Sequence, residues 1–411
     1  MNILFIHQNF PGQFKHLAPA LLARGHKVAA LTAEKNQQKT TITTFRYTMP
    51  FAEPDPRQAR LGTTFTVMTD RAHRVALAAV HMRDKLGFMP DVIFGHCGWG
   101  ETLFLREVWP QARILVYAEF FYATEGLDVG FDPEFSKLTL PVRMSVTSRQ
   151  AHLALAMVQA DAALSPTEWQ ADSFPPEFRS KVTITHDGVD TDALRPDPGA
   201  QYRLPNGQIL RAGDEVLTYV ARNIEPYRGS HIFLRALPDV LAARPDAQVV
   251  IIGSDGVSYS SGPEQGSWRD VFLNEVRDRL DMSRVHLLGR VPYRDFVTLL
   301  QISRAHAYLT VPFVLSWSML EAMSLGALVV ASRTGPVEEV ITDGVNGCLV
   351  DFFDVEGWSE ALINALANPE HLTPLRDKAR RTVIDNYDLQ QICLPRLIRF
   401  VEQAANNASD G

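Results

Sequence analysis

Short apolar runs alternate with helical patterns along the whole chain, and this alternation restricts its fold more than any other feature. The runs at 3–7, 91–95 and 328–331 consist mostly of apolar residues and are bounded by Gly, Pro or Asp. Such continuous runs suit strands that are buried on both faces of a parallel sheet. Because the strands alternate with helices, the sequence predicts doubly wound parallel sheets and therefore an α/β protein.

Turn-forming residues concentrate near the middle of the chain, between residues 194 and 214. Prolines and glycines punctuate this stretch, and its dipeptide Asn206-Gly207 is typical of a tight hairpin. We therefore expect two domains that face each other across a cleft. The last helix either closes the second domain or packs back onto the first. The predicted parts are an N-terminal domain at 1–193, a linker with a small hairpin at 194–214, a C-terminal domain at 215–388 and a final helix at about 389–405.

The composition is that of a globular protein and disfavours several classes of function. Hydrophobic residues make up 46% of the chain and its net charge is −7, whereas nucleic-acid binders are more often basic. The cysteines Cys97, Cys348 and Cys393 are widely spaced, which suits a reducing compartment. The sequence contains neither a signal-peptide pattern nor an apolar run of about 18 residues. We expect a cytoplasmic protein that binds no nucleic acid, and we leave open a peripheral contact with the inner face of the membrane.

Two arginines fall in one predicted strand-to-helix loop. Arg222 follows the strand at 217–221, and Arg228 comes six residues later, just before a helix. Guanidinium groups bind phosphate through paired N–H donors, so two of them in one loop can grip a diphosphate from two sides. The spacing is equally compatible with two solvated surface arginines, one of them paired with Glu225.

A strand, a loop and a helix follow one another at 308–323, where the sequence reads YLTVPFVLSWSMLEAM. We predict that the helix begins near Ser318. Its first N–H groups suit a phosphate, because they have no partner in the helix and lie at the positive end of its dipole. Glu321 stands three residues after Ser318, and two roles are open for it. It either forms a capping box with Ser318 or accepts hydrogen bonds from two ribose hydroxyls.

The C-terminal half resembles the large retaining glycosyltransferase family 4, whose fold is called GT-B. The matching stretches are 222–229, VHLLGRV at 285–291, LEAMSLG at 320–326 and GPVEEVITDGVNGCLV at 335–350. The resemblance implies two Rossmann-like domains facing across a cleft, the GT-B arrangement.

The resemblance also implies roles for single residues. Arg222 and Arg228 correspond to the Arg and Lys that bind the donor diphosphate, and Glu321 corresponds to the glutamate that binds the donor ribose. Arg290 and Val291 match the region that receives the nucleotide base. The implied donor-binding residues in this half are Arg290, Val291, Ser316, Ser318, Met319, Leu320 and Glu321.

One position departs from the family pattern. The family usually carries a Glu-x7-Glu pair, whose first glutamate lies beside the transferred sugar. In this chain Phe313 stands eight residues before Glu321. We interpret the chain as a distinct branch of the family, because the phosphate and ribose positions are retained.

The N-terminal half resembles the family more loosely. Gly12 matches the second glycine of a family Gly-Gly loop, where it either lets a substrate approach the backbone or serves a plain turn. His96 follows the strand at 91–95, and a histidine near this position bonds the donor sugar in family members, so we assign it a catalytic role with Arg222 and Arg228. Glu119 and Tyr122 follow the next strand and either hold an acceptor sugar or only pack.

The resemblance implies a retaining, metal-independent glycosyltransferase of the hexosyltransferase type, active in polysaccharide or glycoconjugate biosynthesis. The donor is a nucleotide sugar, with UDP mildly preferred over GDP, and the acceptor is a glycan, lipid-linked or small-molecule hydroxyl. We expect no cofactor and no metal, since no metal-ligand spacing is present. Two alternatives remain open: a nucleotide-sugar epimerase of the same fold, and a nucleotide-sugar-binding protein without catalysis.

Overall fold

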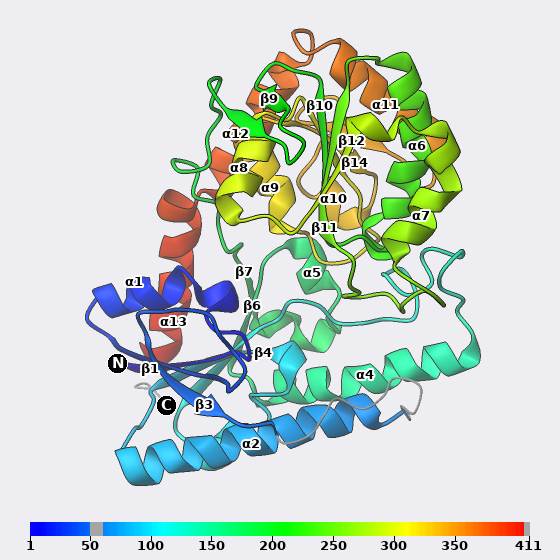
Figure 1. Cartoon of the computed structure of the whole chain (residues 1–411). Helices are drawn as coiled ribbons and strands as arrows, with labels where there is room; N and C mark the ends of the chain where they lie inside the picture. The colour runs from blue at the N-terminus through cyan, green and yellow to red at the C-terminus, as the bar shows by residue number, and fades with distance from the viewer. Residues whose placement is uncertain (50–60, 407–411) are drawn as a thin grey trace. The chain divides into compact units, whose positions relative to one another are not determined.

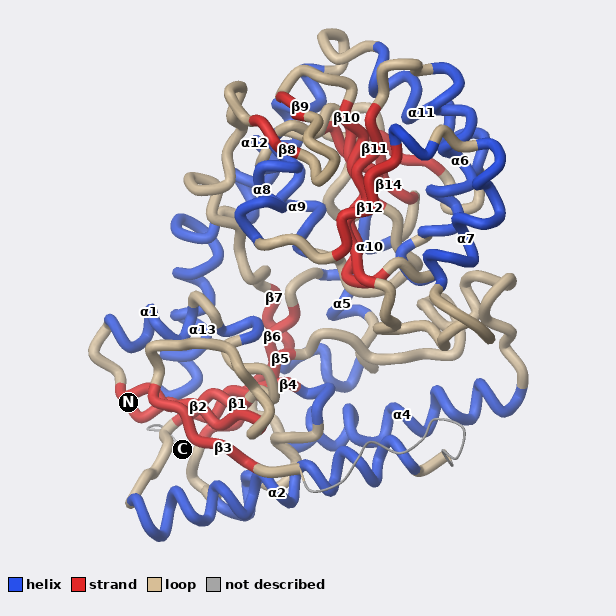
Figure 2. Tube along the Cα trace, in the orientation of Figure 1, coloured by secondary structure: helices blue, strands red, loops and turns tan. Residues whose placement is uncertain are grey.

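Parallel strands form the framework of the protein, whose computed structural model describes residues 1–49 and 61–406. The chain divides into two compact units. Unit 1 comprises Met1–Gly188 and Gln390–Gly411, and unit 2 comprises Val189–Leu389. Each unit contains its own parallel sheet with helices on both faces (Figures 1 and 2). The predicted α/β class with two doubly wound sheets is therefore confirmed.

The sheet of unit 1 has the order β3-β2-β1-β4-β5-β6-β7, with every neighbouring pair parallel. The change of direction at β1 creates a crevice at the carboxyl ends of β1 and β4, where ligands of such sheets bind. Its strands are β1 Asn2–Ile6, β2 Lys27–Ala33, β3 Thr43–Tyr47, β4 Val92–His96, β5 Arg113–Tyr117, β6 Ala162–Ser165 and β7 Val182–Ile184.

Alternate residues of the strands in unit 1 supply two separate cores. Ile3 and Phe5 of β1 pack on one face of the sheet, and Leu4 and Ile6 pack on the other. This pattern follows from the two-residue period of a strand. The first face is covered by α1 and α13, and the second by α2 and α4 (Figure 1). The helices are α1 Leu17–Ala23, α2 Thr63–Leu86, α3 Leu105–Val108, α4 Leu140–Gln159, α5 Glu168–Asp172 and α13 Leu394–Asn406.

The sheet of unit 2 has the order β12-β11-β10-β13-β14-β15 and is parallel throughout. Its order reverses between β10 and β13, so the carboxyl ends of these strands border a second crevice. The strands are β10 Val216–Asn223, β11 Gln248–Ser254, β12 Val285–Gly289, β13 Ala305–Tyr308, β14 Leu328–Ser332 and β15 Cys348–Val350.

Helices cover both faces of this second sheet (Figure 1). The helix pairs α6 with α7 and α6 with α11 are in contact, and α9 packs against α12. Residues of α8, α9 and α12 share one apolar core with β10, β11 and β14. The helices are α6 Ser230–Ala243, α7 Trp268–Val276, α8 Tyr293–Gln301, α9 Trp317–Ser324, α10 Gly335–Glu338, α11 Val355–Ala367 and α12 Thr373–Tyr387.

The segment that we predicted as a linker belongs to unit 2. Leu194, Leu204 and Leu210 are buried in the core that α8, α9 and α12 share. The hairpin around Asn206-Gly207 is present, with β8 Gln201–Arg203 antiparallel to β9 Ile209–Arg211. Apolar side chains occur at intervals along this stretch and pack into the core of unit 2. The many turn residues between them led us to predict a linker instead.

The last helix returns to unit 1. After the π-helical turn Leu389–Cys393, α13 places Leu397, Phe400 and Val401 against the core that contains β1 and β4. Phe400 contacts Phe94, with ring centroids 5.8 Å apart. We considered that this helix either closes the second domain or packs back onto the first, and it packs onto the first.

The edge strand β3 was not expected, because its sequence TTFRY is polar and only half-buried, unlike the continuous apolar runs of the other strands.

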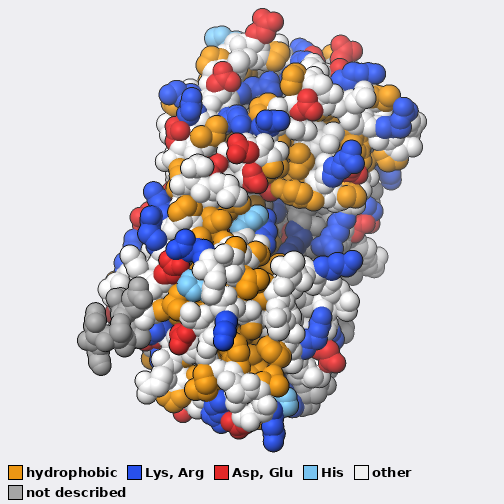
Figure 3. Space-filling model, turned by 90° about the vertical axis from the view of Figure 1, so that its left-hand side faces the viewer, with side chains coloured by type: hydrophobic (Ala, Val, Ile, Leu, Met, Phe, Trp, Pro, Cys, Tyr) orange, Lys and Arg blue, Asp and Glu red, His pale blue; other side chains and the backbone are white. Residues whose placement is uncertain are grey.

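On the face that Figure 3 draws, acidic and basic side chains are interspersed. Among the helices that the structure describes, none combines the length and the apolar character needed to cross a membrane.

Candidate functional site

A pocket of about 360 Å³ opens in unit 2 at the carboxyl ends of three strands. Arg222 comes from β10, Gly253 from β11 and Gly289 from β12, and the opposite wall is the beginning of α9. This is the edge of a parallel sheet at which ligands bind. The lining residues are Ala221, Arg222, Ile252, Gly253, Gly289, Arg290, Val291, Tyr293, Phe296, Ser316, Trp317, Ser318 and Glu321.

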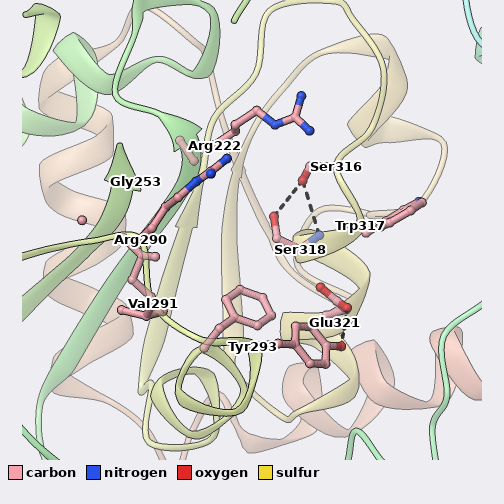
Figure 4. Close-up of a pocket in the computed structure, with 13 residues that line it drawn as sticks. Arg222, Gly253, Arg290, Val291, Tyr293, Ser316, Trp317, Ser318 and Glu321 are labelled. Carbon is pink, nitrogen blue, oxygen red and sulfur yellow. Dashed lines mark hydrogen bonds between the residues drawn. The ribbon is translucent and has the colours of Figure 1, made fainter. Parts of the chain in front are cut away.

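Helix α9 begins one residue earlier than we predicted, and Ser316 is its N-cap. The Ser316 hydroxyl accepts a hydrogen bond from the Ser318 N–H at 3.4 Å and lies 3.0 Å from the Ser318 hydroxyl. Ser316 and Ser318 therefore line the pocket together at the N-terminus of the helix (Figure 4). Such a group of donors at the positive end of a helix suits a phosphate.

The capping box that we considered for Ser318 and Glu321 is absent. Ser318 lies inside the helix, so its side chain cannot cap it. The Glu321 carboxylate accepts a hydrogen bond from the Tyr293 hydroxyl at 2.7 Å. Glu321 lines the pocket one turn into α9 (Figure 4). Of the two roles considered for this residue, contact with a ligand is the one that the geometry favours.

Two arginines with exposed side chains enter the pocket from the strand side. Figure 4 shows Arg222 and Arg290 on the side of the strands, opposite Ser316, Ser318 and Glu321 on α9. The pocket thus presents two positive charges on the side of the strands and, on the opposite wall, a helix N-terminus followed by a carboxylate. That arrangement fits a ligand with an anionic part and a hydroxyl-bearing part.

Arg228 does not line the pocket. Its side chain is buried, and its Nη1 donates hydrogen bonds to the Thr310 hydroxyl at 2.7 Å and the Val314 carbonyl at 3.3 Å. Arg228 therefore supports the loop at 309–316 from behind, while Arg222 faces the pocket. The grip on one anion by both arginines that we predicted is not the arrangement observed.

Two other predicted donor contacts are core residues. Met319 and Leu320 are fully buried in the core that α9 shares with β14. Phe313, at the position of the missing glutamate, is also buried, and its ring lies 5.0 Å from that of Tyr259 and 5.5 Å from that of Tyr227. The substitution thus places an aromatic cluster where the family pattern has a carboxylate.

A second group of polar side chains gathers in unit 1, at the carboxyl ends of β1, β4 and β5. The His96 Nε2 atom lies 3.5 Å from a carboxylate oxygen of Glu119, and the His96 Nδ1 atom accepts a hydrogen bond from the Gly98 N–H at 2.9 Å. Partial burial raises the pKa of Glu119, but its hydrogen bond with His96 and the attraction between the two side chains hold that pKa below its usual value. Two residues that we singled out separately are therefore neighbours.

His7 and Gln13 complete this group, and we did not predict them. The ring centroids of His7 and His96 are 6.0 Å apart, and the Gln13 amide donates to Glu119 at 3.4 Å. Burial lowers the pKa of His7 to about 3, so this ring is neutral at physiological pH. His7 could have been predicted as a site residue because it directly follows β1, and polar residues at the carboxyl ends of neighbouring parallel strands lie close together.

Gly12 and Tyr122 have mainly structural surroundings. Gly12 has a φ of +47°, and a Cβ atom there would come within 2.8 Å of the His7 ring, so glycine leaves the space that His7 occupies. The Tyr122 ring packs edge-on against Phe120 and lies 5.8 Å from the guanidinium carbon of Arg149.

Two protein families match this chain, one on each side of residue 200. Residues 24–194 match the family described as Glycosyl transferase family 4 group, and residues 205–382 match Glycosyl transferases group 1. Together these matches cover most of both units. The chain belongs to the family 4 glycosyltransferases. Its two α/β units with parallel sheets are those of the GT-B fold.

Relatives with named activities resemble this glycosyltransferase at moderate identity. The GDP-mannose-dependent alpha-(1-6)-phosphatidylinositol monomannoside mannosyltransferase of Mycolicibacterium smegmatis is 25% identical over 303 residues, which are 68% of this chain and 69% of that protein. The chain spans only about half the length of the D-inositol 3-phosphate glycosyltransferases that it also matches.

Solved structures share the fold of this glycosyltransferase. Sucrose-phosphate synthase from Thermosynechococcus elongatus has a TM-score of 0.72 at 18% identity and covers 98% of this chain and 100% of its own. Anabaena HepE in complex with UDP and glucose has a TM-score of 0.65 at 15% identity, with 99% and 100% covered. At these low sequence identities, the similarity is evidence for a shared fold alone.

Proposed function

We propose that this chain transfers a sugar from a nucleoside-diphosphate sugar to an acceptor hydroxyl, and that the pocket in unit 2 binds the nucleotide part of the donor. The observation that carries the proposal is the arrangement of the pocket wall. Arg222 and the Ser316 end of α9 both line the pocket, and Glu321 follows one turn further along the same helix.

The charges of the pocket suggest how the donor lies in it. The diphosphate is held by Arg222 and by the hydroxyls of Ser316 and Ser318 at the N-terminus of α9. The ribose hydroxyls donate to Glu321, whose orientation is set by Tyr293. The base lies toward Arg290 and Val291, which also line the pocket.

We propose that the reaction retains the anomeric configuration and needs no divalent metal. The acceptor oxygen bonds to the anomeric carbon while the bond from that carbon to the diphosphate oxygen breaks, and the acceptor proton passes to the leaving diphosphate on the same face. Among the described residues that line the pocket, Glu321 is the one carboxylate, and it accepts a hydrogen bond from Tyr293. Arg222 and the helix N-terminus stabilise the departing charge.

The acceptor is proposed to contact unit 1. There the buried His96 side chain is paired with the partly exposed carboxylate of Glu119, and such a carboxylate can bond the hydroxyls of a sugar. The relative from Mycolicibacterium smegmatis is named for a phosphatidylinositol monomannoside acceptor. We therefore place a glycan or lipid-linked hydroxyl first among the acceptors to be tested, with small molecules as the other class.

Calorimetric titration of the full chain with UDP, GDP, UDP-glucose and GDP-mannose tests the donor assignment. We expect one nucleotide and its sugar to bind and to raise the melting temperature, with the UDP pair as our first choice and unchanged affinity in the presence of EDTA. Donor turnover should depend on an acceptor, and NMR of the product reports its anomeric configuration. Formation of an epimer from donor alone would indicate an isomerase instead, and the absence of binding by either pair would overturn the proposal.

A further inference from the structure

The loop between β11 and α7 (Figure 2) is bonded to a buried carboxylate that follows β10. Glu225, which is 1% exposed, accepts hydrogen bonds from three successive backbone N–H groups of the loop, those of Ser258, Tyr259 and Ser260. The Ser260 hydroxyl donates to the same oxygen at 2.8 Å. A buried charge is costly unless it is fully hydrogen-bonded, so these bonds fix the loop to the end of β10.

The residue that this attachment places is Tyr259. Its ring lies 5.0 Å from Phe313 and 5.6 Å from Tyr227, and the guanidinium carbon of Arg228 is 5.7 Å from its centroid. Despite these contacts Tyr259 remains 38% exposed. Part of Tyr259 is therefore exposed at the surface beside the loop at 309–316.

The position of this ring follows from the direction of α9. Glu321 lies one turn into the helix, Ser318 and Ser316 lie at its start, and Phe313 precedes it. Moving along these residues in that order leads from the ribose contact to the diphosphate contact and then to the loop that Tyr259 covers. Arg228 spans the last step, because it bonds the Val314 carbonyl and lies under Tyr259. On the proposed function, a group attached beyond the diphosphate extends toward the loop at 309–316, against which Tyr259 packs through Phe313.

We propose that Tyr259 is a specificity-determining residue for the transferred sugar and that Glu225 positions it. The ring offers a flat apolar surface on which the C–H face of a sugar stacks, and its hydroxyl offers one hydrogen-bonding group at the edge. This proposal rests on the proposed function, because it takes the pocket as the nucleotide site.

The test compares the affinity for a nucleotide with the affinity for its sugar. Titrations use UDP with UDP-glucose and GDP with GDP-mannose, on the full chain and on the variants Tyr259→Ala, Tyr259→Phe and Val257→Ala. Val257 is a matched control, since it lies in the same loop and is also exposed. We expect Tyr259→Ala to weaken binding of the nucleotide sugar about three- to tenfold while affinity for the free nucleotide stays within about twofold.

The conservative variant separates the ring from the hydroxyl. Tyr259→Phe should restore most of the affinity for the nucleotide sugar, and Val257→Ala should resemble the wild type. If Tyr259→Ala lowers both affinities equally, or neither, the inference is overturned while the proposed function stands. If the wild-type chain binds neither nucleotide, both are overturned.

A double-variant cycle tests the positioning role of Glu225. Glu225→Ala removes the carboxylate that accepts from the loop, so it should reduce the preference for the nucleotide sugar as Tyr259→Ala does. If Glu225 acts through Tyr259, the variant with both changes should lose no more of that preference than Tyr259→Ala alone. Additive losses would overturn the positioning role, since they would mean that Glu225 acts by another route.

Discussion

The Glu321 carboxylate accepts a hydrogen bond from the Tyr293 hydroxyl at 2.7 Å, which joins the first residue of α8 to the second turn of α9 at the wall of the pocket. A tyrosine donor of this kind holds a carboxylate in one orientation without neutralising its charge. Glu321 is therefore ready to accept from a ligand, and its role can be separated from the stability of the helix.

Replacing Glu321 should weaken nucleotide binding far more than it weakens the fold. Hydrogen bonds to a charged group contribute about 1.5–3 kcal/mol, so we expect Glu321→Ala to reduce affinity for the bound nucleotide about 10- to 100-fold by calorimetry. Glu321→Gln keeps an acceptor for Tyr293 but loses the charge, so its affinity for the nucleotide should lie between those of the wild type and Glu321→Ala. Tyr293→Phe is the control, with a loss of only a few-fold. Unchanged affinity in Glu321→Ala would refute the ribose contact.

Arg222 provides the clearest test of the diphosphate site. Its side chain is exposed and lines the pocket, so its removal leaves the core intact. We expect Arg222→Ala to weaken nucleoside-diphosphate binding at least tenfold and Arg222→Lys to recover part of it, since Lys keeps the charge without the paired donors. The matched control is Arg211→Ala, an exposed arginine on the hairpin. Equal affinities for the two alanine variants would contradict the assignment.

Arg228 differs in kind from Arg222, and this shows where reasoning from sequence reached its limit. Arg222 lies near the end of β10 and Arg228 follows that strand; both carry the same charge, and the resemblance assigned them to one ligand. Only the fold reveals that a 3-10 turn, Pro226–Arg228, places the second side chain under the loop at 309–316. Spacing along a loop does not fix which way its side chains point.

Strands and their order of alternation were predictable because burial on both faces leaves a continuous apolar run. Val216–Asn223 and Gln248–Ser254 follow this rule, and their carboxyl ends supplied Arg222 and the pocket as expected. The contacts of Tyr259 were not predictable. They depend on Glu225 and Phe313, which are far from it in sequence and reach it only through the fold.

The N-cap of α9 should contribute to stability in a way that Glu321 does not. Ser316 accepts from the Ser318 N–H, and loss of a serine N-cap typically costs about 1 kcal/mol. We expect Ser316→Ala to lower the melting temperature of the chain without ligand, whereas Ser318→Ala should lower it less. Both should weaken nucleotide binding, because both hydroxyls line the pocket. A larger loss of stability in Ser318→Ala would restore Ser318 as the cap.

A buried acid in unit 1 should make stability depend on pH. Glu101 is fully buried, and burial raises its pKa to about 7, while the Tyr47 hydroxyl and the charge of Arg71 oppose that rise. The pKa is higher in the folded state than the ordinary value of 4.5, so the folded chain holds this proton more tightly. The associated stability is complete below pH 4.5 and is lost as the pH rises toward 7.

Glu101→Gln keeps the acceptor for Tyr47 but cannot ionise, so it should remove the loss of folding stability that occurs as the pH rises. We expect the variant to match the wild type near pH 5 and to exceed it at pH 8 by up to about 3 kcal/mol, the value of a shift of about 2.5 pKa units. Denaturant titrations at both pH values measure the difference. Glu107→Gln, an exposed acid nearby on α3, is the control and should change little at either pH. An equal effect of Glu101→Gln at pH 5 and pH 8 would show that Glu101 does not titrate in this range.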